Sequence, residues 1–210
     1  MGRQAEKTRQ SRERILRAAT AEFGAKGYDA ASITAICEKN NIPKGLVYHN
    51  FKGKDDLYLR CAEICFHAMT AYLAAGKEPG RDVQESLREL LLRREQFFRE
   101  NPCCRQIFFQ TLLYPPVHLA EELRALRREL DEFHREYYRG VLRRLHLREG
   151  ITEETAIRHF LLFQEAFNAS FQAQSGGESF PALIEAHEQQ LLPALDILLY
   201  GVAEQDGTAG

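Results

Sequence analysis

Apolar residues recur at steps of three and four along one stretch of the chain, and this spacing constrains the fold more than any other feature of the sequence. Within residues 119–145 the apolar positions are Leu119, Leu123, Leu126, Leu130, Phe133, Tyr137, Val141 and Leu145. Such steps place side chains on one stripe of an α-helix. The other faces carry arginines interleaved with acidic residues, which is typical of a solvated, ion-paired surface rather than of a nucleic-acid surface. The sequence therefore predicts a long helix with one buried side.

The rest of the chain also favours helices. No clear period-two alternation is present, and no Asn-Gly or Asp-Gly pair indicates a hairpin turn. Glycine and proline segments, such as Tyr114-Pro115-Pro116, divide the chain into shorter periodic stretches. We therefore expect an all-α fold with nine helices, at about residues 6–27, 33–40, 44–50, 54–75, 82–100, 102–113, 117–148, 153–174 and 180–203.

Composition narrows the class of protein. Hydrophobic residues make up 44% of the 210 residues, which is enough for a globular core. No run of about 18 apolar residues is present, so no membrane span is expected. The first residues, MGRQAEKTRQSRER, are charged and lack the apolar segment of a signal peptide. We expect a cytoplasmic protein, whose five cysteines, an odd number, would not build a disulfide framework.

The net charge of −2 is unevenly distributed along the chain. Residues 1–60 contain 12 Lys and Arg against 7 Asp and Glu, a balance of +5, whereas residues 61–210 contain 16 against 23, a balance of −7. A basic quarter on an acidic body suggests that the N-terminal end meets a polyanion, although charge alone also fits a chance fluctuation.

Residues 6–50 carry the signals of three helices with a tight turn before the last. Gly27 follows the first apolar face, and Ser32 precedes the second helix in a favoured N-cap position. In the turn NNIP, Asn40 or Asn41 can take the left-handed backbone conformation. The expected core positions are Ile15, Leu16, Ala19, Phe23, Ile33, Ile36, Val47 and Phe51. The third helix would then display Lys44, Gly45, Leu46, Tyr48, His49 and Asn50.

Two short helices joined by a tight turn form a helix-turn-helix motif, whose second helix presents its N-terminal half to base edges. Gly45 would let the helix backbone approach DNA closely, and Lys44 and Lys54 would replace counterions on phosphates. The N–H groups at the starts of the helices at 33–40 and 54–75 would add phosphate contacts.

Residues 15–58 resemble the DNA-binding domain of the TetR family of bacterial transcriptional repressors. The residues that match the family pattern, in register, are Ile15, Ala18, Ala19, Phe23, Gly27, Ser32, Ile36, Lys44, Gly45, Tyr48, Phe51, Lys54 and Leu57. The remainder resembles the family only in length and helical pattern. Asn41 replaces a glycine of the family's turn, Pro43 replaces a serine, and Leu46 replaces a small hydroxyl residue. Leu46 can contact a thymine methyl but cannot donate a hydrogen bond, so the family's operator preference does not transfer.

The resemblance implies a helix-turn-helix DNA-binding domain at 1–53 and an effector-binding and dimerisation domain at 54–210. It assigns phosphate contacts to Ser32, Thr34, Tyr48 and Lys54. It brings His49 and Asn50 to base edges or nearby phosphates, and asparagine is suited to adenine. The resemblance also implies that the basic residues Arg3, Lys7 and Arg9 form a disordered arm that reaches along the DNA backbone.

The resemblance further implies a homodimer on a two-fold operator, and the last two predicted helices support it. Their apolar faces are too wide for one-sided packing, so each can face the core and a partner at once. The apolar residues concerned are Ile157, Phe160, Leu161, Phe163, Phe167, Phe171, Leu183, Ile184, Leu191, Leu192, Leu195, Leu198 and Leu199. A four-helix bundle across a two-fold axis would bury them.

The resemblance places a small-molecule effector among the helices between 54 and 174. The candidate apolar lining is Phe66, Met69, Tyr72, Phe97, Phe98, Phe108, Phe109, Tyr114, Phe133, Tyr137, Phe163 and Phe167. The polar additions are Gln110, His134, Gln164 and Asn168. Most would be core residues, and a pocket of this composition would suit an apolar or aromatic effector.

Other functions stay open at this point. The pairs Cys61 with Cys65 and Cys103 with Cys104 allow a thiol- or metal-sensing regulator, although adjacent cysteines on a helix diverge by about 100°. A helical-bundle haem or metal protein would use His118, His134 and His159, and a DNA binder without an effector would be architectural. No catalytic motif appears, so we expect a ligand-responsive repressor that is not an enzyme and holds no cofactor or metal.

Overall fold

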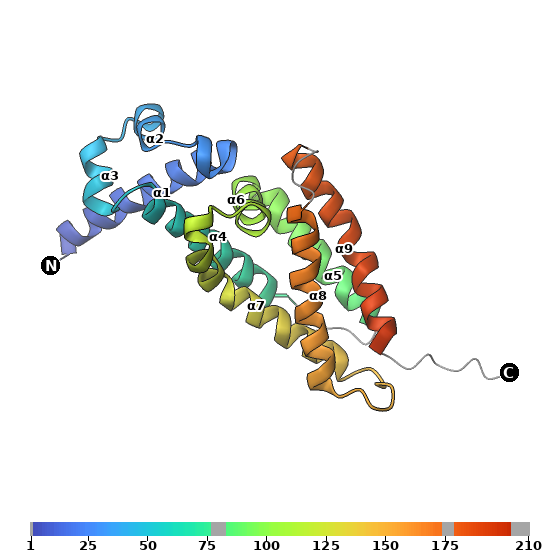
Figure 1. Ribbon diagram of the computed structural model, residues 1–210. Helices are drawn as coiled ribbons and strands as arrows, with labels where there is room; N and C mark the ends of the chain where they lie inside the picture. Colours follow the sequence, from blue (N-terminus) through green and yellow to red (C-terminus); the bar gives the residue numbers. More distant parts are fainter. Residues whose placement is uncertain (1, 77–82, 174–178, 203–210) are drawn as a thin grey trace. The chain divides into compact units, whose positions relative to one another are not determined.

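Helices account for nearly all of the described chain, which covers residues 2–76, 83–173 and 179–202 of a computed structural model (Figure 1). Within these ranges the chain forms nine α-helices and one short 3-10 helix, η1. Their bounds are α1 Gly2–Ala30, α2 Ile33–Asn40, α3 Lys44–Asn50, α4 Lys54–Ala74, α5 Val83–Glu100, α6 Pro102–Leu113, η1 Val117–Leu119, α7 Ala120–Leu142, α8 Glu153–Ala173 and α9 Phe180–Val202. The predicted all-α fold with nine helices is confirmed.

The bounds of α2, α3 and α6 agree with the predicted ranges, and α4 ends one residue earlier than predicted. The predicted ends at residues 82, 174 and 203 lie outside the described residues. Asn101 precedes Pro102, the first residue of α6, where a missing N–H leaves no hydrogen bond unmade. Thr152 caps α8, because its Oγ1 accepts a hydrogen bond from Thr155 N at 3.1 Å.

Helix α1 is longer than the predicted 6–27, and it is interrupted at Gly27. The backbone there has φ 79° and ψ 172°, a conformation that residues other than glycine rarely adopt. A Cβ at this position would also collide with the side-chain amide of Gln110 on α6. Gly27 therefore ends the regular helix, and one further turn carries the chain to Ala30.

The predicted helix at 117–148 is wrong at both ends. Pro116 precedes a 3-10 turn, in which Leu119 N donates to Pro116 O at 2.9 Å, and α7 proper starts at Ala120. At the other end α7 stops at Leu142, and Leu145 N donates to Leu142 O at 3.0 Å in a tighter turn. The apolar spacing continues past Leu142 because Leu145 and Leu147 pack against the core from the turn, without belonging to the helix.

Backbone packing divides the chain into two units, one of residues 1–69 with 97–129 and the other of residues 70–96 with 130–210. Helices α4, α5 and α7 contribute residues to both. In the first unit the core of α1, α2 and α3 includes Ile15, Phe23, Ile36, Val47 and Phe51, each at most 2% exposed. These were predicted core positions, and their burial confirms them.

The second unit has a core built from α5, α7, α8 and α9. Tyr138 on α7 stacks on Phe160 on α8, with ring centroids 4.0 Å apart and an interplanar angle of 11°. Leu195 and Leu199 on α9 and Leu87 on α5 complete the same apolar cluster.

The predicted division of function between residues 53 and 54 stays a prediction. Among the described residues, no helix combines the length and the apolar character that crossing a membrane requires.

Candidate nucleic-acid interface

The turn between α2 and α3 is fixed by its own residues. Ser32 lies in an extended conformation before α2, and its Oγ accepts a hydrogen bond from Ala35 N at 3.1 Å. Asn41 takes the left-handed conformation, with φ 50° and ψ 44°, and Ile42 N returns to Cys37 O at 2.9 Å. The predicted N-cap and the predicted left-handed asparagine are both confirmed. This turn sets the direction in which α3 leaves α2.

Helix α3 is held from one side. Val47 is fully buried and Phe51, directly after the helix, is 2% exposed. On the surface lie Lys44, Gly45, His49 and Tyr48, the last with 53% exposure. A solvent-facing tyrosine has no packing role to explain it, so the exposed side of α3 is available to a partner.

The predicted display of Leu46 and Asn50 is only partly correct, since both are half-buried. Asn50 Nδ2 donates to Leu46 O at 2.8 Å, so the amide is turned back along its own helix. This hydrogen bond would have to break before Asn50 could read a base. Its DNA-contacting role stays a prediction.

Arginines of α1 hold the C-terminal ends of both short helices, which the sequence reasoning missed. Arg14 Nη2 donates to Asn40 O at 2.7 Å and to Asn41 O at 3.1 Å. Arg12 Nη1 donates to Asn50 O at 3.3 Å, and its guanidinium lies 4.7 Å from the centre of the Phe51 ring. Carbonyls at a helix C-terminus lack intrahelical partners and carry partial negative charge, so arginine both satisfies and neutralises them.

A buried carboxylate joins α1 to α2. Glu22 is 4% exposed and pairs with Lys26 Nζ at 2.6 Å and with Lys39 Nζ at 2.7 Å. The hydrogen bonds from Lys26 and Lys39 hold the pKa of Glu22 below its usual value. Lys39 is therefore engaged within the protein, although the sequence presents it as part of the basic N-terminal region.

Lys54, at the start of α4, contacts the end of α1. Its Nζ donates to Asp29 O at 3.1 Å and lies 4.4 Å from the centre of the Tyr28 ring. The Tyr28 hydroxyl donates to Asp55, and His118 Nε2 lies 3.3 Å from the same hydroxyl. Burial, followed by the hydrogen bond to Asp55, raises the pKa of Tyr28 to about 12. The phosphate contact of Lys54 stays a prediction.

The starts of α2 and α3 are linked directly. Lys44 Nζ donates to Thr34 Oγ1 at 3.2 Å, and both side chains are exposed. With Ser32 they place a hydroxyl pair and an ammonium group at neighbouring helix N-termini, which is suitable for phosphate oxygens. Next to them, a Cβ at Gly45 would meet no atom within 4 Å.

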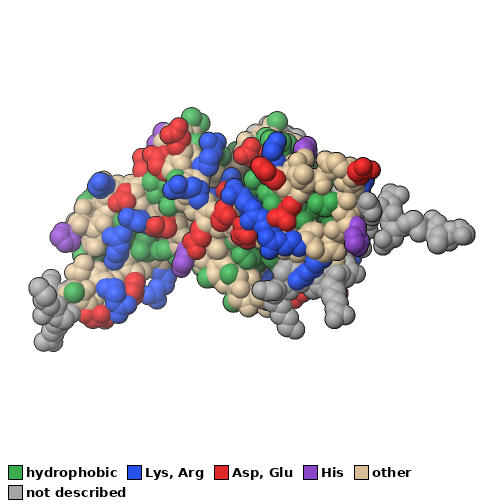
Figure 2. Space-filling view, turned by 90° about the horizontal axis from the view of Figure 1, so that it is seen from below, with side chains coloured by type: hydrophobic (Ala, Val, Ile, Leu, Met, Phe, Trp, Pro, Cys, Tyr) green, Lys and Arg blue, Asp and Glu red, His purple; other side chains and the backbone are tan. Residues whose placement is uncertain are grey.

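The predicted disorder of the basic arm is wrong for Lys7 and Arg9, because both belong to the regular helix α1. Arg9 pairs with Glu6 and Glu13 at 2.7 Å each. The side chain of Arg3 lies outside the described residues. On the face shown in Figure 2, Lys and Arg side chains are interspersed with Asp and Glu, not gathered in one continuous basic surface.

The predicted effector residues fall into two sets, one in each unit. In the first unit Phe66, Met69, Phe97, Phe98, Phe108 and Phe109 are at most 6% exposed. The Phe108 ring lies 5.9 Å from Phe66, 5.2 Å from Phe98 and 5.1 Å from Phe109. Gln110 packs against Gly27, and Tyr114 is 38% exposed. This set therefore forms a packed aromatic core.

The second unit contains half-buried candidates, namely Tyr72, Phe133, His134, Tyr137, Phe163, Gln164, Phe167 and Asn168. Tyr137 donates its hydroxyl to Ser86 O at 2.8 Å. Phe167 contacts the ring of His187, which is 2% exposed and lies 3.0 Å from Asn168 Oδ1. The sequence reasoning missed His187, since a lone histidine within an apolar helix carries no distinguishing signal.

The histidines considered for a metal or haem are dispersed among other contacts. His118 lies beside Asp55, and His159 Nδ1 is 2.8 Å from Thr155 O on its own helix. Over the ranges that the structure covers, no group of three or more His, Cys, Asp and Glu side chains could hold a metal ion.

Comparisons with known proteins agree with this geometry. Residues 15–61 match the family of bacterial regulatory proteins described as the tetR family, and residues 81–200 match the tetracyclin repressor-like C-terminal domain. The second match alone covers more than half of the chain. The chain belongs to the TetR family. The TetR family comprises bacterial transcriptional regulators, which are not enzymes, and this membership implies binding to operator DNA and to a small-molecule effector.

One curated relative is the HTH-type negative transcriptional regulator IcaR of the biofilm operon icaADBC in Staphylococcus epidermidis. It is 29% identical over 62 residues, which are 30% of this chain and 34% of IcaR. The match thus spans about a third of the length of that relative.

Solved TetR-like structures match over most of the chain. SmeT, the repressor of the Stenotrophomonas maltophilia multidrug efflux pump SmeDEF, gives a TM-score of 0.65 at 21% identity, covering 93% of this chain and 91% of SmeT. The fatty acid degradation regulator FadR from Bacillus halodurans gives 0.59 at 15% identity, covering 86% and 97%. These likenesses show the fold.

Proposed function

We propose that the protein is a ligand-responsive repressor that acts in the cytoplasm, binds a palindromic operator as a homodimer, and is released by a small apolar or aromatic effector. One observation carries the operator contact: α3 is anchored by Val47 and Phe51 while Lys44, Gly45 and Tyr48 remain on the surface. Repression is supported by IcaR and SmeT, which are described as a negative regulator and a repressor.

Exposed apolar side chains on the last two helices support the dimer. Leu162 on α8 is 56% exposed and Ile197 on α9 is 75% exposed. A second copy of the same surface would remove both from water in a self-complementary interface. The two-fold axis would set the two copies of α3 about 34–36 Å apart, one turn of DNA.

The predicted effector residues are mostly aromatic, which supports an apolar or aromatic effector. Small-molecule sites in proteins are lined mainly by apolar and aromatic side chains. Such an effector releases the operator only if it binds the released conformation more tightly than the DNA-bound one. Displacement of the protein from DNA can be screened with compounds graded by polarity. A screen in which only small hydrophilic compounds act would contradict this part of the proposal.

The deciding experiment is selection of bound DNA from random sequence, followed by affinity measurements on the selected site. We expect a palindrome. Tyr48→Phe removes one hydroxyl from each α3 and should weaken binding about tenfold, since each phosphate hydrogen bond is worth about 0.5–1.5 kcal/mol. Tyr114→Phe, which removes a hydroxyl from another exposed tyrosine, should leave the affinity unchanged. A non-palindromic site, or equal effects of the two variants, would contradict the proposal.

A further inference from the structure

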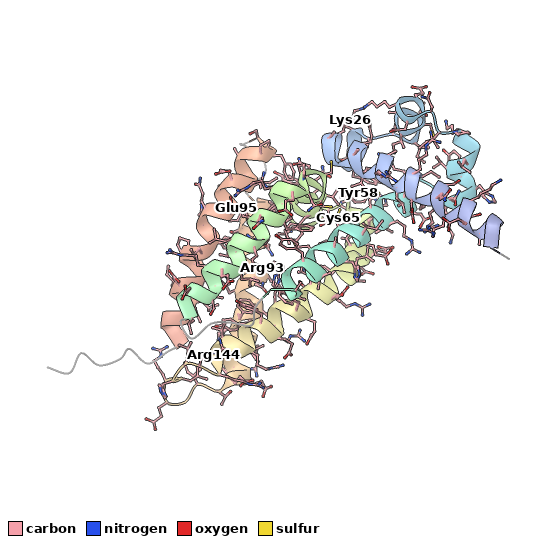
Figure 3. All side chains as sticks on the ribbon, turned by 180° about the vertical axis from the view of Figure 1, so that it is seen from behind. Lys26, Tyr58, Cys65, Arg93, Glu95 and Arg144 are labelled. Carbon is pink, nitrogen blue, oxygen red and sulfur yellow. The ribbon has the colours of Figure 1, made fainter. Side chains whose placement is uncertain are left out.

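Four of the five cysteines lie on two helices of the first unit, with Cys61 and Cys65 on α4 and Cys103 and Cys104 on α6. One pair is distinguished by its geometry: Cys65 Sγ lies 2.7 Å from Cys104 Sγ. A disulfide bond is about 2.0 Å long, so closing it would need a movement of only about 0.7 Å. Cys65 is on α4 below Tyr58 in Figure 3.

Cys65 and Cys104 were not predicted to form a pair from the sequence. Spacing along each helix suggested the pairs 61 with 65 and 103 with 104. The structure instead turns Cys103 toward α1, where a Cβ at Gly24 would come within 2.7 Å of its Cα. Cys104, about 100° further around the helix, is thereby directed to Cys65.

The two thiols of the pair are chemically unequal. Cys65 is 3% exposed, whereas Cys104 is half-buried and closer to solvent. Cys65 donates its S–H to the sulfur of Cys104, which lowers the pKa of Cys104 and raises that of Cys65. A thiolate is the reactive form of cysteine, so Cys104 is suited to attack an oxidant and Cys65 to resolve the product.

We propose that Cys65 and Cys104 form a reversible disulfide in response to hydroperoxides, and that this bond lowers the affinity of the protein for its operator. The thiolate of Cys104 attacks the peroxide O–O bond, giving a sulfenic acid and releasing water or an alcohol. The thiol of Cys65 then attacks the sulfenic sulfur, the S–S bond forms, and water leaves. Both cysteines are oxidised by one electron each and the peroxide is reduced by two. A low-molecular-weight thiol reverses the step by exchange.

The consequence for DNA follows from what the two helices hold. Helix α4 begins at Lys54, three residues after Phe51, and α6 packs against α1 with no room for a side chain at Gly24. A bond between Cys65 and Cys104 would therefore tie α4 to the helix that supports α1. It would fix the separation of α4 and α6 and so restrict how α3 adjusts to its groove. This consequence rests on the proposed function, whereas the bond itself does not.

The test uses the full chain and hydrogen peroxide. Peptide mapping by mass spectrometry of treated protein should show a disulfide between Cys65 and Cys104, and the affinity for the operator selected under reducing conditions should fall at least tenfold and recover with dithiothreitol. Cys104→Ser should remove both effects. Cys103→Ser is the matched control, since it removes the neighbouring half-buried thiol, and it should retain both.

Two results would overturn the inference: no bond between Cys65 and Cys104 in the treated protein, or a mapped bond with unchanged operator affinity. Should Cys104→Ser fail to fold, Cys65→Ala gives the same comparison, and retention of the peroxide effect in it would also count against the bond. A reduced protein that selects no operator would refute the proposed function, and the peptide map would still decide whether the disulfide forms.

Discussion

At the scale of one residue, the open space beside Gly45 indicates that a partner approaches α3 there. It lies in the first turn of α3, and a side chain added there would meet no atom within 4 Å. Glycine inside a helix costs about 0.5–1 kcal/mol relative to alanine. Packing within the chain gives no reason for this cost, whereas a DNA backbone lying against α3 does.

We therefore predict opposite effects of Gly45→Ala on folding and on binding. The free energy of unfolding should rise by about 0.5–1 kcal/mol, because alanine restricts the unfolded chain and fits the helix. Operator affinity should fall at least tenfold, because the added methyl group would separate α3 from DNA. Chemical denaturation and fluorescence anisotropy measure the two quantities. An unchanged affinity would show that DNA does not approach Gly45.

Replacing Gly27 should have the opposite effect on folding, because it lowers the stability of the protein. Gly27→Ala forces a side chain into φ 79° and against Gln110, so the free energy of unfolding should fall by more than about 2 kcal/mol. In the Gln110→Ala background the collision is relieved, and about 1–3 kcal/mol of backbone strain should remain. Equal losses in both backgrounds, measured by denaturation, would show that Gln110 does not contribute.

Residues whose role is set by the local backbone were predictable from the sequence. Ser32 as a cap and Asn41 as a left-handed residue depend on neighbours a few positions away. The contacts of Arg14 and Lys54 depend on which carbonyls come within reach once the helices pack, and no local signal carries that. Asn50 is intermediate, because its position was predictable but the return of its amide to Leu46 O was not.

At the scale of the helices, α1 is joined to α2 by the carboxylate of Glu22, which is ionised only when the pH is above its pKa. The pKa of Glu22 is lowered in the folded state by its hydrogen bonds to Lys26 and Lys39. Its stabilising contribution is therefore fully present above the pKa of the unfolded chain, roughly 4.3, and is lost as the pH falls through the folded-state pKa.

Glu22→Gln should accordingly destabilise the protein at pH 7 and have a smaller effect at pH 3. We expect a loss of about 1 kcal/mol at pH 7, below the roughly 1.5–3 kcal/mol of charged hydrogen bonds, because both lysines are more than a third exposed. Denaturation at the two pH values measures it. Glu63→Gln, which breaks the exposed pair with Arg60, is the control and should change little at either pH. A loss that is the same at pH 3 would contradict the assignment.

Helix bounds were predictable where a cap, a proline or a glycine marks them, as at Ser32 and Pro102. The end of α7 was not, because apolar spacing reports burial and not backbone conformation. Leu145 and Leu147 are partly buried and pack against the second unit's core from a turn, so their positions continue the stripe of α7 without continuing its hydrogen bonds.

At the scale of the whole molecule, the proposed dimer gives a direct prediction. The double variant Leu162→Glu with Ile197→Glu places charges on the exposed faces of α8 and α9 and should convert the protein to a monomer. Val117→Glu, at a position 92% exposed in the first unit, is the matched control and should remain a dimer. Sedimentation velocity distinguishes the two states. A double variant that stays dimeric would place the interface elsewhere.

The fold class was predictable because helical spacing and breakers recur along the whole chain. The grouping of the effector candidates was not. Phe108 and Phe167 have the same character in the sequence, yet the structure places them in different units. Which apolar residues share a core depends on how the helices pack, and α4, α5 and α7 each contribute to both units.

The internal contacts of the basic residues near α2 and α3 have a consequence for the ionic-strength dependence of operator binding. If all 12 Lys and Arg of residues 1–60 met phosphates in both protomers, the logarithm of the affinity would fall with the logarithm of salt concentration with a slope of about −20. Arg12, Arg14, Lys26 and Lys39 instead neutralise carbonyls or a carboxylate of the protein itself. The measured slope should therefore be at least about a third shallower, and the operator complex should tolerate salt better than the charge of the N-terminal region suggests.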